Sequence, residues 1–514
     1  MWSRDVTLVR RGAVALLVFF LAQWVEGTFV FAQTLIVPSI SASETYDSNV
    51  FYTPKTLLGP DQKPEDFVTT VTPQINFARA GSLMRAGLSV GASIAKYLHN
   101  PDLDYTGVNA AGTLDFKSAA SKLSQRITTL TVNGIYQFTP SMSGFSASTG
   151  GGLGTGFGGT QVGALNSGLV TNRVSMNTYN LGVTGGYQLT RVTTLLANYT
   201  YTKVSFGKQS GGVDNQLFDT TGHQGTTTIS TQISARDTVG ATATMSHYIQ
   251  EQASGSSGQG SFTTIAETLN WARLWTQKLS TSLGGGGILT LPIGSSIPGQ
   301  SIKSQFAPTA TATMTYSSFS EGLRAAGSSV SPFDGLPSLA GMLNPGGINA
   351  AGGYTAAMSY NFSIFPSYAF GSGPIKTHVV GVNASAGLTS KLTAQVGANY
   401  SHGTTSFPTS TFDTVGLTAG ARYLIGPVLA SLTYDWLYFS SSTAQSPLSQ
   451  NSQSDEYAFS KKMVMLSFSY AFTSQSFFRM DQFGFGGQSS GSGGTTSPSS
   501  GELGSGAAGT GLGK

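Results

Sequence analysis

Apolar and small polar residues alternate along most of this chain, with the period of two that is typical of β-strands. In the stretch 413–425, Val, Leu, Ala, Ala and Tyr occupy alternate positions, and Thr, Gly, Thr, Gly and Arg lie between them. The stretches 392–401 and 428–438 repeat this pattern, each with a Tyr or Trp towards one end. These strands are longer than the roughly 5–6 residues usual in soluble sheets. An apolar face, a polar face and terminal aromatic residues together indicate strands that cross a membrane.

The connections between these strands are of two kinds, short turns and longer segments rich in Gly, Ser, Thr and Pro. Strict alternation of short and long connections is typical of a membrane barrel, with periplasmic turns at one end and extracellular loops at the other. A β-sandwich has no reason to keep this rhythm. The short turns lie at 189–191, 235–237, 388–391 and 425–427, and the long connections at 53–66, 139–177, 207–222, 251–260 and 441–455.

The chain is therefore expected to be an all-β protein, a single transmembrane antiparallel up-and-down β-barrel. Counting strands between Leu35 and Phe472 gives about 18, with 16 or 20 as the alternatives, and an even number is expected because both ends should lie in the periplasm. The region 316–376 leaves a choice, because 322–332, 354–370 or both can be strands.

The first 32 residues have the pattern of a secretory signal peptide. Three arginines precede an apolar segment at 12–22, and Val-Phe-Ala at 30–32 offers small residues for cleavage. An uncleaved anchor is the alternative, but this apolar segment is short for a spanning helix. The predicted organisation is a signal peptide at 1–32, an outer-membrane barrel at 33–472 and a disordered Gly/Ser-rich periplasmic tail at 473–514.

Composition agrees with a barrel. Only 10% of the 514 residues are charged, against about 25% in a typical soluble domain. After residue 32 no segment approaches the roughly 18 apolar residues that a spanning helix needs, which leaves a closed barrel as the membrane solution. A soluble sandwich or β-solenoid is the rival. The absence of Cys excludes disulfides and thiolate metal sites, and a net charge of +4 is too small to suggest nucleic acid.

The last predicted strand ends in an aromatic residue, Phe472. The alternation over 464–472 resembles the C-terminal signal by which the outer-membrane assembly machinery recognises its substrates. It departs from that signal because 473–514 follows it.

Two segments near the start of the barrel carry a family resemblance. The sequence TYDSNVF at 45–51 and the sequence DFVTTVTP at 66–73 are similar to the opening of the beta-barrel porin 2 family, which includes outer-membrane barrels associated with exopolysaccharide (PEP-CTERM) systems. The segment SVSP at 329–332 resembles a later part of such proteins and favours 322–332 as the uncertain strand. The resemblance implies a porin-like or polysaccharide-export-associated role.

No arrangement of residues predicts catalysis or a cofactor. The five histidines have neither the spacing from Ser expected of an outer-membrane phospholipase nor a directly preceding Asp, and His99 and His402 fall at expected loop edges. No two histidines have metal-ligand spacing. Asp102 and Asp104 form an acidic loop, read as solvated rather than as a weak Ca²⁺ site. The run of four glycines at 284–287 lies in a strand and allows a close approach to the wall.

The remaining candidate chemistry is the lining of a pore. Charges on a lumen wall set ion preference, and with so few of them selectivity should be slight, although Arg422 and Asp435 can instead pair with each other. Glu267 falls on the apolar face, so we expect a bulge there or a wrong face. Residues assigned to the inward face are Arg85, Gln395, Asn399, Arg422 and Asp435, with Gln74, Asn76 and Asn198 as further neutral lining.

The predicted function is a porin-like passive channel in outer-membrane lipid that passes small solutes or polysaccharide. The long connection 139–177 is expected to narrow the channel. The alternative is a non-conducting structural or interaction barrel with loops filling its lumen.

Overall fold

The structure is a computed structural model, in which the described part of the chain is 33–51, 54–55, 58, 63–142, 174–207, 218–252, 259–295, 304–318, 353–366, 374–406, 409–443 and 456–472. The predicted signal peptide, the predicted tail, most of the long connection 139–177 and the segment 322–332 therefore lie outside the described residues. No helix within the described residues is long and apolar enough to span a membrane.

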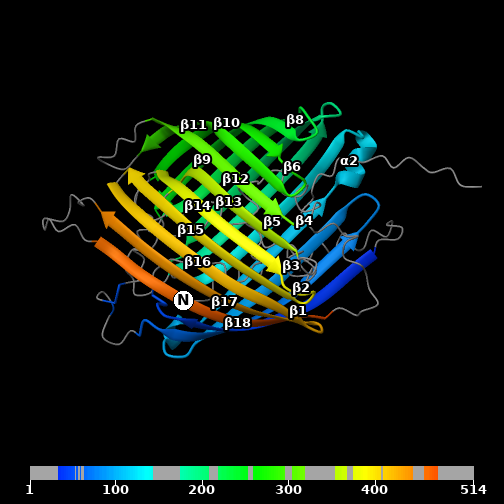
Figure 1. The fold of residues 1–514 in the computed structure, drawn as a ribbon. Helices are drawn as coiled ribbons and strands as arrows, with labels where there is room; N and C mark the ends of the chain where they lie inside the picture. Colours follow the sequence, from blue (N-terminus) through cyan, green and yellow to red (C-terminus); the bar gives the residue numbers. More distant parts are fainter. Residues whose placement is uncertain are drawn as a thin grey trace, which may run out of the picture.

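Eighteen antiparallel strands form one closed sheet, which confirms the predicted barrel and the predicted count. Each strand pairs with its neighbours in the chain, and the last strand, β18, pairs with the first, β1. Figure 1 shows the tilted strands around the barrel, with blue β1 beside orange β18. The strands are β1 Gln33–Asp47, β2 Asp66–Ala80, β3 Arg85–Tyr97, β4 Tyr105–Asp115, β5 Ile127–Met142, β6 Val174–Gln188, β7 Thr193–Phe206, β8 Phe218–Gln232, β9 Asp237–Gln252, β10 Gln259–Leu274, β11 Leu279–Ser295, β12 Gln305–Ser317, β13 Tyr354–Pro366, β14 Pro374–Gly387, β15 Leu392–Ser406, β16 Thr409–Ile425, β17 Val428–Thr443 and β18 Glu456–Ala471.

The period-two pattern of the sequence becomes an outer and an inner face, because successive side chains of a strand point to opposite sides. On β2 the outward Ile75 is 57% exposed, whereas the inward Gln74 and Asn76 on either side of it are buried. Outward Leu269 and Val396 are 73% and 58% exposed. A polar interior and an apolar exterior are the reverse of a soluble protein, and they are what a barrel surrounded by lipid requires.

Most connections follow the predicted rhythm, so the barrel has a turn end and a long-loop end. Three connections break it. At the long-loop end β15 and β16 are joined by 407–408 alone. At the turn end β4 and β5 are separated by 116–126, and β12 and β13 by 318–353. Two short helices also lie in connections: η2 Pro101–Leu103 between β3 and β4, and α2 Lys117–Leu123 between β4 and β5.

The choice left open at 316–376 is settled by the pairing. β13 occupies Tyr354–Pro366 and pairs directly with β12, so no strand lies between them. The preference for 322–332, which rested on the SVSP segment, is therefore wrong. Both segments alternate, and alternation alone does not say which of them has pairing partners on both sides.

Glu267 keeps its place on the outer face. The register of β10 with β11 shifts between Gly260 and Phe262, whereas that with β9 does not shift. Both run without a shift past Glu267, which lies opposite Ala243 and Gly287. The expected bulge at this residue is absent from β10, and Glu267 is exposed among outward apolar side chains.

Candidate functional site

The inner wall carries a repeated pair of residues, an amide side chain on one strand and a glycine directly opposite it on the next. Asn399 lies opposite Gly416, and Gln395 lies opposite Gly420. In each pair the amide group occupies the space that a Cβ atom on the glycine would need. The same arrangement recurs around the barrel at Asn109 with Gly91, Asn133 with Gly182 and Asn270 with Gly284.

This pairing has two physical consequences. The amide lies flat across the neighbouring strand instead of projecting towards the barrel axis. The wall therefore gains a polar group while the lumen stays almost as wide. The lining that results is uncharged and offers both hydrogen-bond donors and acceptors. Alternation along β15 assigns Gln395 and Asn399 to the inner face, but it gives no sign of the pairing, because register is set by the sheet and is not visible in one strand.

The buried amides on β2 form a network instead. Gln74 Nε2 donates to Asn76 Oδ1 at 2.6 Å and lies 2.7 Å from Ser89 Oγ. Asn76 Nδ2 lies 3.3 Å from both Val37 O and Ser39 Oγ. Three neighbouring strands are thereby cross-linked through neutral polar groups.

The charged residues assigned to the inner face lie on it, but Arg422 and Asp435 do not contact each other. Asp435 accepts a hydrogen bond from Thr418 Oγ1 at 2.7 Å. Arg422 is four residues further along β16, opposite Ser431, and at about 3.3 Å per residue it is well beyond ion-pair distance from Asp435. Arg85 lies opposite Asp115 at the turn end. The alternative, in which Arg422 pairs with Asp435, is therefore not found, because the register places Thr418 opposite the aspartate.

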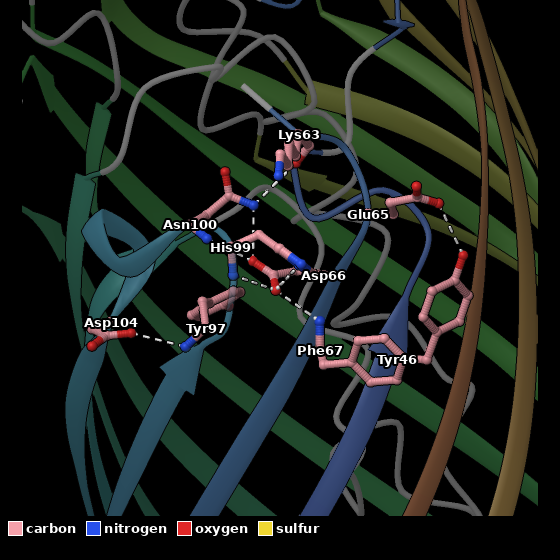
Figure 2. Close-up of polar contacts among 9 residues, drawn as sticks. All are labelled: Tyr46, Lys63, Glu65, Asp66, Phe67, Tyr97, His99, Asn100 and Asp104. Carbon is pink, nitrogen blue, oxygen red and sulfur yellow. Dashed lines mark hydrogen bonds and ion pairs between the residues drawn. The ribbon is translucent and has the colours of Figure 1, made fainter. Parts of the chain in front are cut away.

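Asp66, the first residue of the segment 66–73 and one to which the sequence assigned no role, organises one part of the rim. Figure 2 shows the Asp66 side chain pointing into the connection between β3 and β4. Its Oδ1 accepts from the backbone N–H groups of Phe67 and His99 at 2.8 and 2.9 Å and lies 3.2 Å from His99 Nδ1. Its Oδ2 accepts from the Asn100 backbone and side chain at 2.9 and 2.8 Å.

The residues around Asp66 make further contacts that hold the same connection. Asn100 Nδ2 also donates to the Lys63 carbonyl at 3.0 Å, which ties the start of β2 to the connection. Asp104, expected in a solvated acidic loop, forms an ion pair with Lys96 at 2.7 Å and accepts from the Tyr97 N–H. Within the described residues no group of three His, Asp or Glu is placed to hold a metal ion.

Four of the five histidines lie on the outer face, as two directly opposed pairs. His223 lies opposite His247 on β8 and β9, and His378 lies opposite His402 on β14 and β15. His402 lies within β15 and not at a loop edge as expected, and its Nδ1 is 2.9 Å from Asp413 Oδ1. Because Asp413 shares the outer face with exposed Leu417, this contact is directed away from the lumen.

Comparison with known proteins finds distant likenesses among solved structures alone. No family model matches the chain, and no curated protein matches it. Among solved structures, the outer membrane channel DcaP of Acinetobacter baumannii is 9% identical with a TM-score of 0.36, over 86% of this chain and 97% of that one. Acinetobacter baumannii OccAB4 is 10% identical with a TM-score of 0.40, over 86% and 99%. Pseudomonas aeruginosa OccK9 (OpdG) is 10% identical with a TM-score of 0.38, over 85% and 98%.

Proposed function

We propose that this protein is an outer-membrane barrel that acts as a porin-like passive channel for small, uncharged polar solutes. The observation that carries the proposal is the contrast between its two faces. The outer face is apolar, and the inner face is lined by amide and hydroxyl groups, several of which lie flat over glycines. Such a lining hydrogen-bonds to water and to polar solutes along the wall, while leaving room for them to pass.

The membrane assignment rests on the outer face. A continuous exterior of exposed Ile, Leu, Val, Met and Phe side chains would be unfavourable in water. In lipid it is the expected surface, and the closed sheet pairs most of the strand backbone groups that lipid cannot satisfy. The outer membrane follows from the barrel architecture together with the predicted signal peptide.

Weak ion selectivity follows from the charges on the inner face. Asp47 forms an ion pair with Lys461, and Asp66 accepts hydrogen bonds from backbone and side-chain donors. Of the proposed pore-lining residues, Arg85, Arg422 and Asp435 supply the charge, and Gln395 and Asn399 are neutral. Because Asp115 lies opposite Arg85, these lining charges balance, and selectivity should be slight.

A second candidate is a non-conducting structural or interaction barrel. The observation in its favour is the dense packing of the inner wall near the long-loop end, where the inward Phe412, Phe439 and Phe459 are all buried and their rings stack in a row. A channel restricted at that end would conduct poorly. A link to exopolysaccharide export rests on the sequence resemblance alone.

Planar-bilayer recordings of the purified full-length protein test the proposal. Stepwise conductance in KCl, together with uptake of neutral sugars of graded size into proteoliposomes, supports the channel. Folded protein that inserts but gives neither signal supports the non-conducting barrel.

A further inference from the structure

Among the described strands, the ladder has its longest gap between β12 and β13. These strands pair only over their halves near the turn end, from Thr311 with Asn361 to Ser317 with Thr355. The remaining halves, 305–310 and 362–366, keep their pairing with β11 and β14 on their other sides. The wall therefore contains a seam near the long-loop end, formed by two strand edges that face each other without a ladder.

The composition of these edges fits their lack of pairing. Pro308 lies within the unpaired half of β12, and Pro366 ends β13. Proline has no backbone N–H and is confined to strand edges. Across the seam, Thr309 Oγ1 lies 3.5 Å from the Phe362 carbonyl, so a side chain makes the approach that a backbone N–H makes elsewhere.

Phe362 fills the seam. By alternation along β13 it belongs with the outward Met358, which is 53% exposed, yet Phe362 is only 7% exposed. Its side chain packs with Ile288 and Ala307, which point inward from β11 and β12. It also contacts the ring of outward-facing His378, at 4.7 Å between centroids. The Phe362 ring thus reaches from the outer face of the wall to the inner one.

The surroundings of the seam are apolar at its middle and polar at its end. On the outer face Phe306 is 71% exposed and lies over Gly287, where its ring takes the space of a Cβ atom. Towards the long-loop end three buried oxygen atoms have no hydrogen-bond partner: Thr290 Oγ1, Gln305 Oε1 and Thr377 Oγ1. An unsatisfied buried polar atom is unfavourable, and a ligand head group that hydrogen-bonds to these atoms would remove that cost.

We propose that the seam between β12 and β13 is a lateral opening, closed by Phe362, that admits an amphipathic molecule with an aliphatic chain. The chain passes between Ile288 and Ala307 on one side and β13 on the other, and its polar head meets Thr290, Gln305 and Thr377. A channel of this kind connects the lumen to the surrounding lipid as well as to water. The inference rests on the proposed position of the barrel in a bilayer.

Lipid-borne quenchers test the opening directly. The chain has no Cys, so Ala307→Cys provides a single inward site at the seam for a small fluorophore in phosphatidylcholine vesicles containing doxyl-labelled phosphatidylcholine. Two controls lie on β13 where the ladder is complete: inward Ala357→Cys and outward Met358→Cys. We expect the loss of fluorescence at position 307 to approach that at 358, with no loss at 357.

The controls separate the possible failures. Quenching at 307 no greater than at 357 overturns the lateral opening, whereas absence of quenching at 358 overturns the membrane position itself. A doxyl-labelled fatty acid added from the aqueous side to quencher-free vesicles tests whether a free amphiphile enters as well as a bilayer lipid. Phe362→Ala should increase quenching at 307 with either probe.

Disulfide formation provides a second measurement without a bulky label. Directly opposed residues in a ladder have Cα atoms close enough for a disulfide. Thr313→Cys with Ser359→Cys, a pair in register, should therefore oxidise readily. Thr309→Cys with Ser363→Cys, which a continued register would bring opposite each other, should not. Equal oxidation of the two pairs contradicts an open seam.

Discussion

Lys461 Nζ lies 2.6 Å from Asp47 Oδ2, across the junction at which the last strand meets the first. Both side chains point inward, with 1% and 10% of their surfaces exposed. The same junction is reinforced by the backbone, because Ser48 N–H donates to the Lys462 carbonyl at 2.9 Å, and Lys462 N–H donates to Ser48 Oγ at 2.8 Å. Closure of the barrel therefore includes a buried ion pair.

Lys461→Met should destabilise the folded barrel. Removing one partner of a buried ion pair leaves an uncompensated charge and costs about 3–5 kcal/mol, so the temperature at which the protein loses its fast-migrating folded form in SDS gels should fall. Lys462→Met, on the exposed outer face, is the matched control. The double variant with Asp47→Leu should recover most of the loss, and failure to recover would mean that Lys461 acts through other contacts.

Gly416→Val should narrow the channel. A side chain at this position displaces the Asn399 amide from its place over the glycine and turns it towards the lumen. We expect lower single-channel conductance with the barrel still folded. Gly225→Val is the control, since its Cβ would meet no atom within 4 Å. Unchanged conductance in the Gly416 variant would show that the amide does not limit the bore.

Arg422 and Asp435 should shift the ion selectivity of the channel in opposite directions. Arg422→Gln removes a positive charge and should shift the reversal potential in a KCl gradient towards cation preference, whereas Asp435→Asn should shift it towards anion preference. Gln395→Ala, a neutral change on the same wall, should leave the reversal potential in place. A shift of the same sign in both charge variants would contradict a role as pore lining.

Asp66→Ala should loosen the connection between β3 and β4. The backbone amides of His99 and Asn100 lose their acceptor, so their hydrogen exchange should become faster while exchange in the strands is retained. Asp102→Ala, an exposed residue of the same connection, provides the comparison. Equal protection in both variants would show that the connection is held by other contacts.

Glu267→Leu should stabilise the protein in lipid. An acidic side chain on the lipid face is unfavourable by an amount on the order of 1 kcal/mol, and leucine at this position continues the apolar exterior of Ile265 and Leu269. Urea unfolding in phospholipid vesicles measures the change. A loss of stability would instead reveal a membrane partner for the carboxylate.

The sequence predicted the fold more completely than the contacts of the candidate site. Alternation along each strand identifies its two faces, so the barrel, its strand count and the inward position of residues such as Asn399 could be predicted. What lies opposite a residue depends on register, which a single strand does not determine. The contact of Asp435 with Thr418 and that of Asp66 with His99 therefore became visible only in the assembled sheet.

The region around β13 also shows what alternation along a single strand cannot predict. Two segments with equal alternation competed for one position, and a short motif favoured the wrong one. The seam was likewise hidden, because Phe362 continues the apolar pattern of its strand and gives no sign that it is turned into the wall.

The amide and glycine pairs of the inner wall imply that two positions on neighbouring strands together set the width of the proposed channel. Each pair joins residues on neighbouring strands, such as Asn399 with Gly416, so a change on one strand has its effect through the other. Variation among related chains should therefore show these positions changing together: where the glycine gains a side chain, the amide opposite should become smaller.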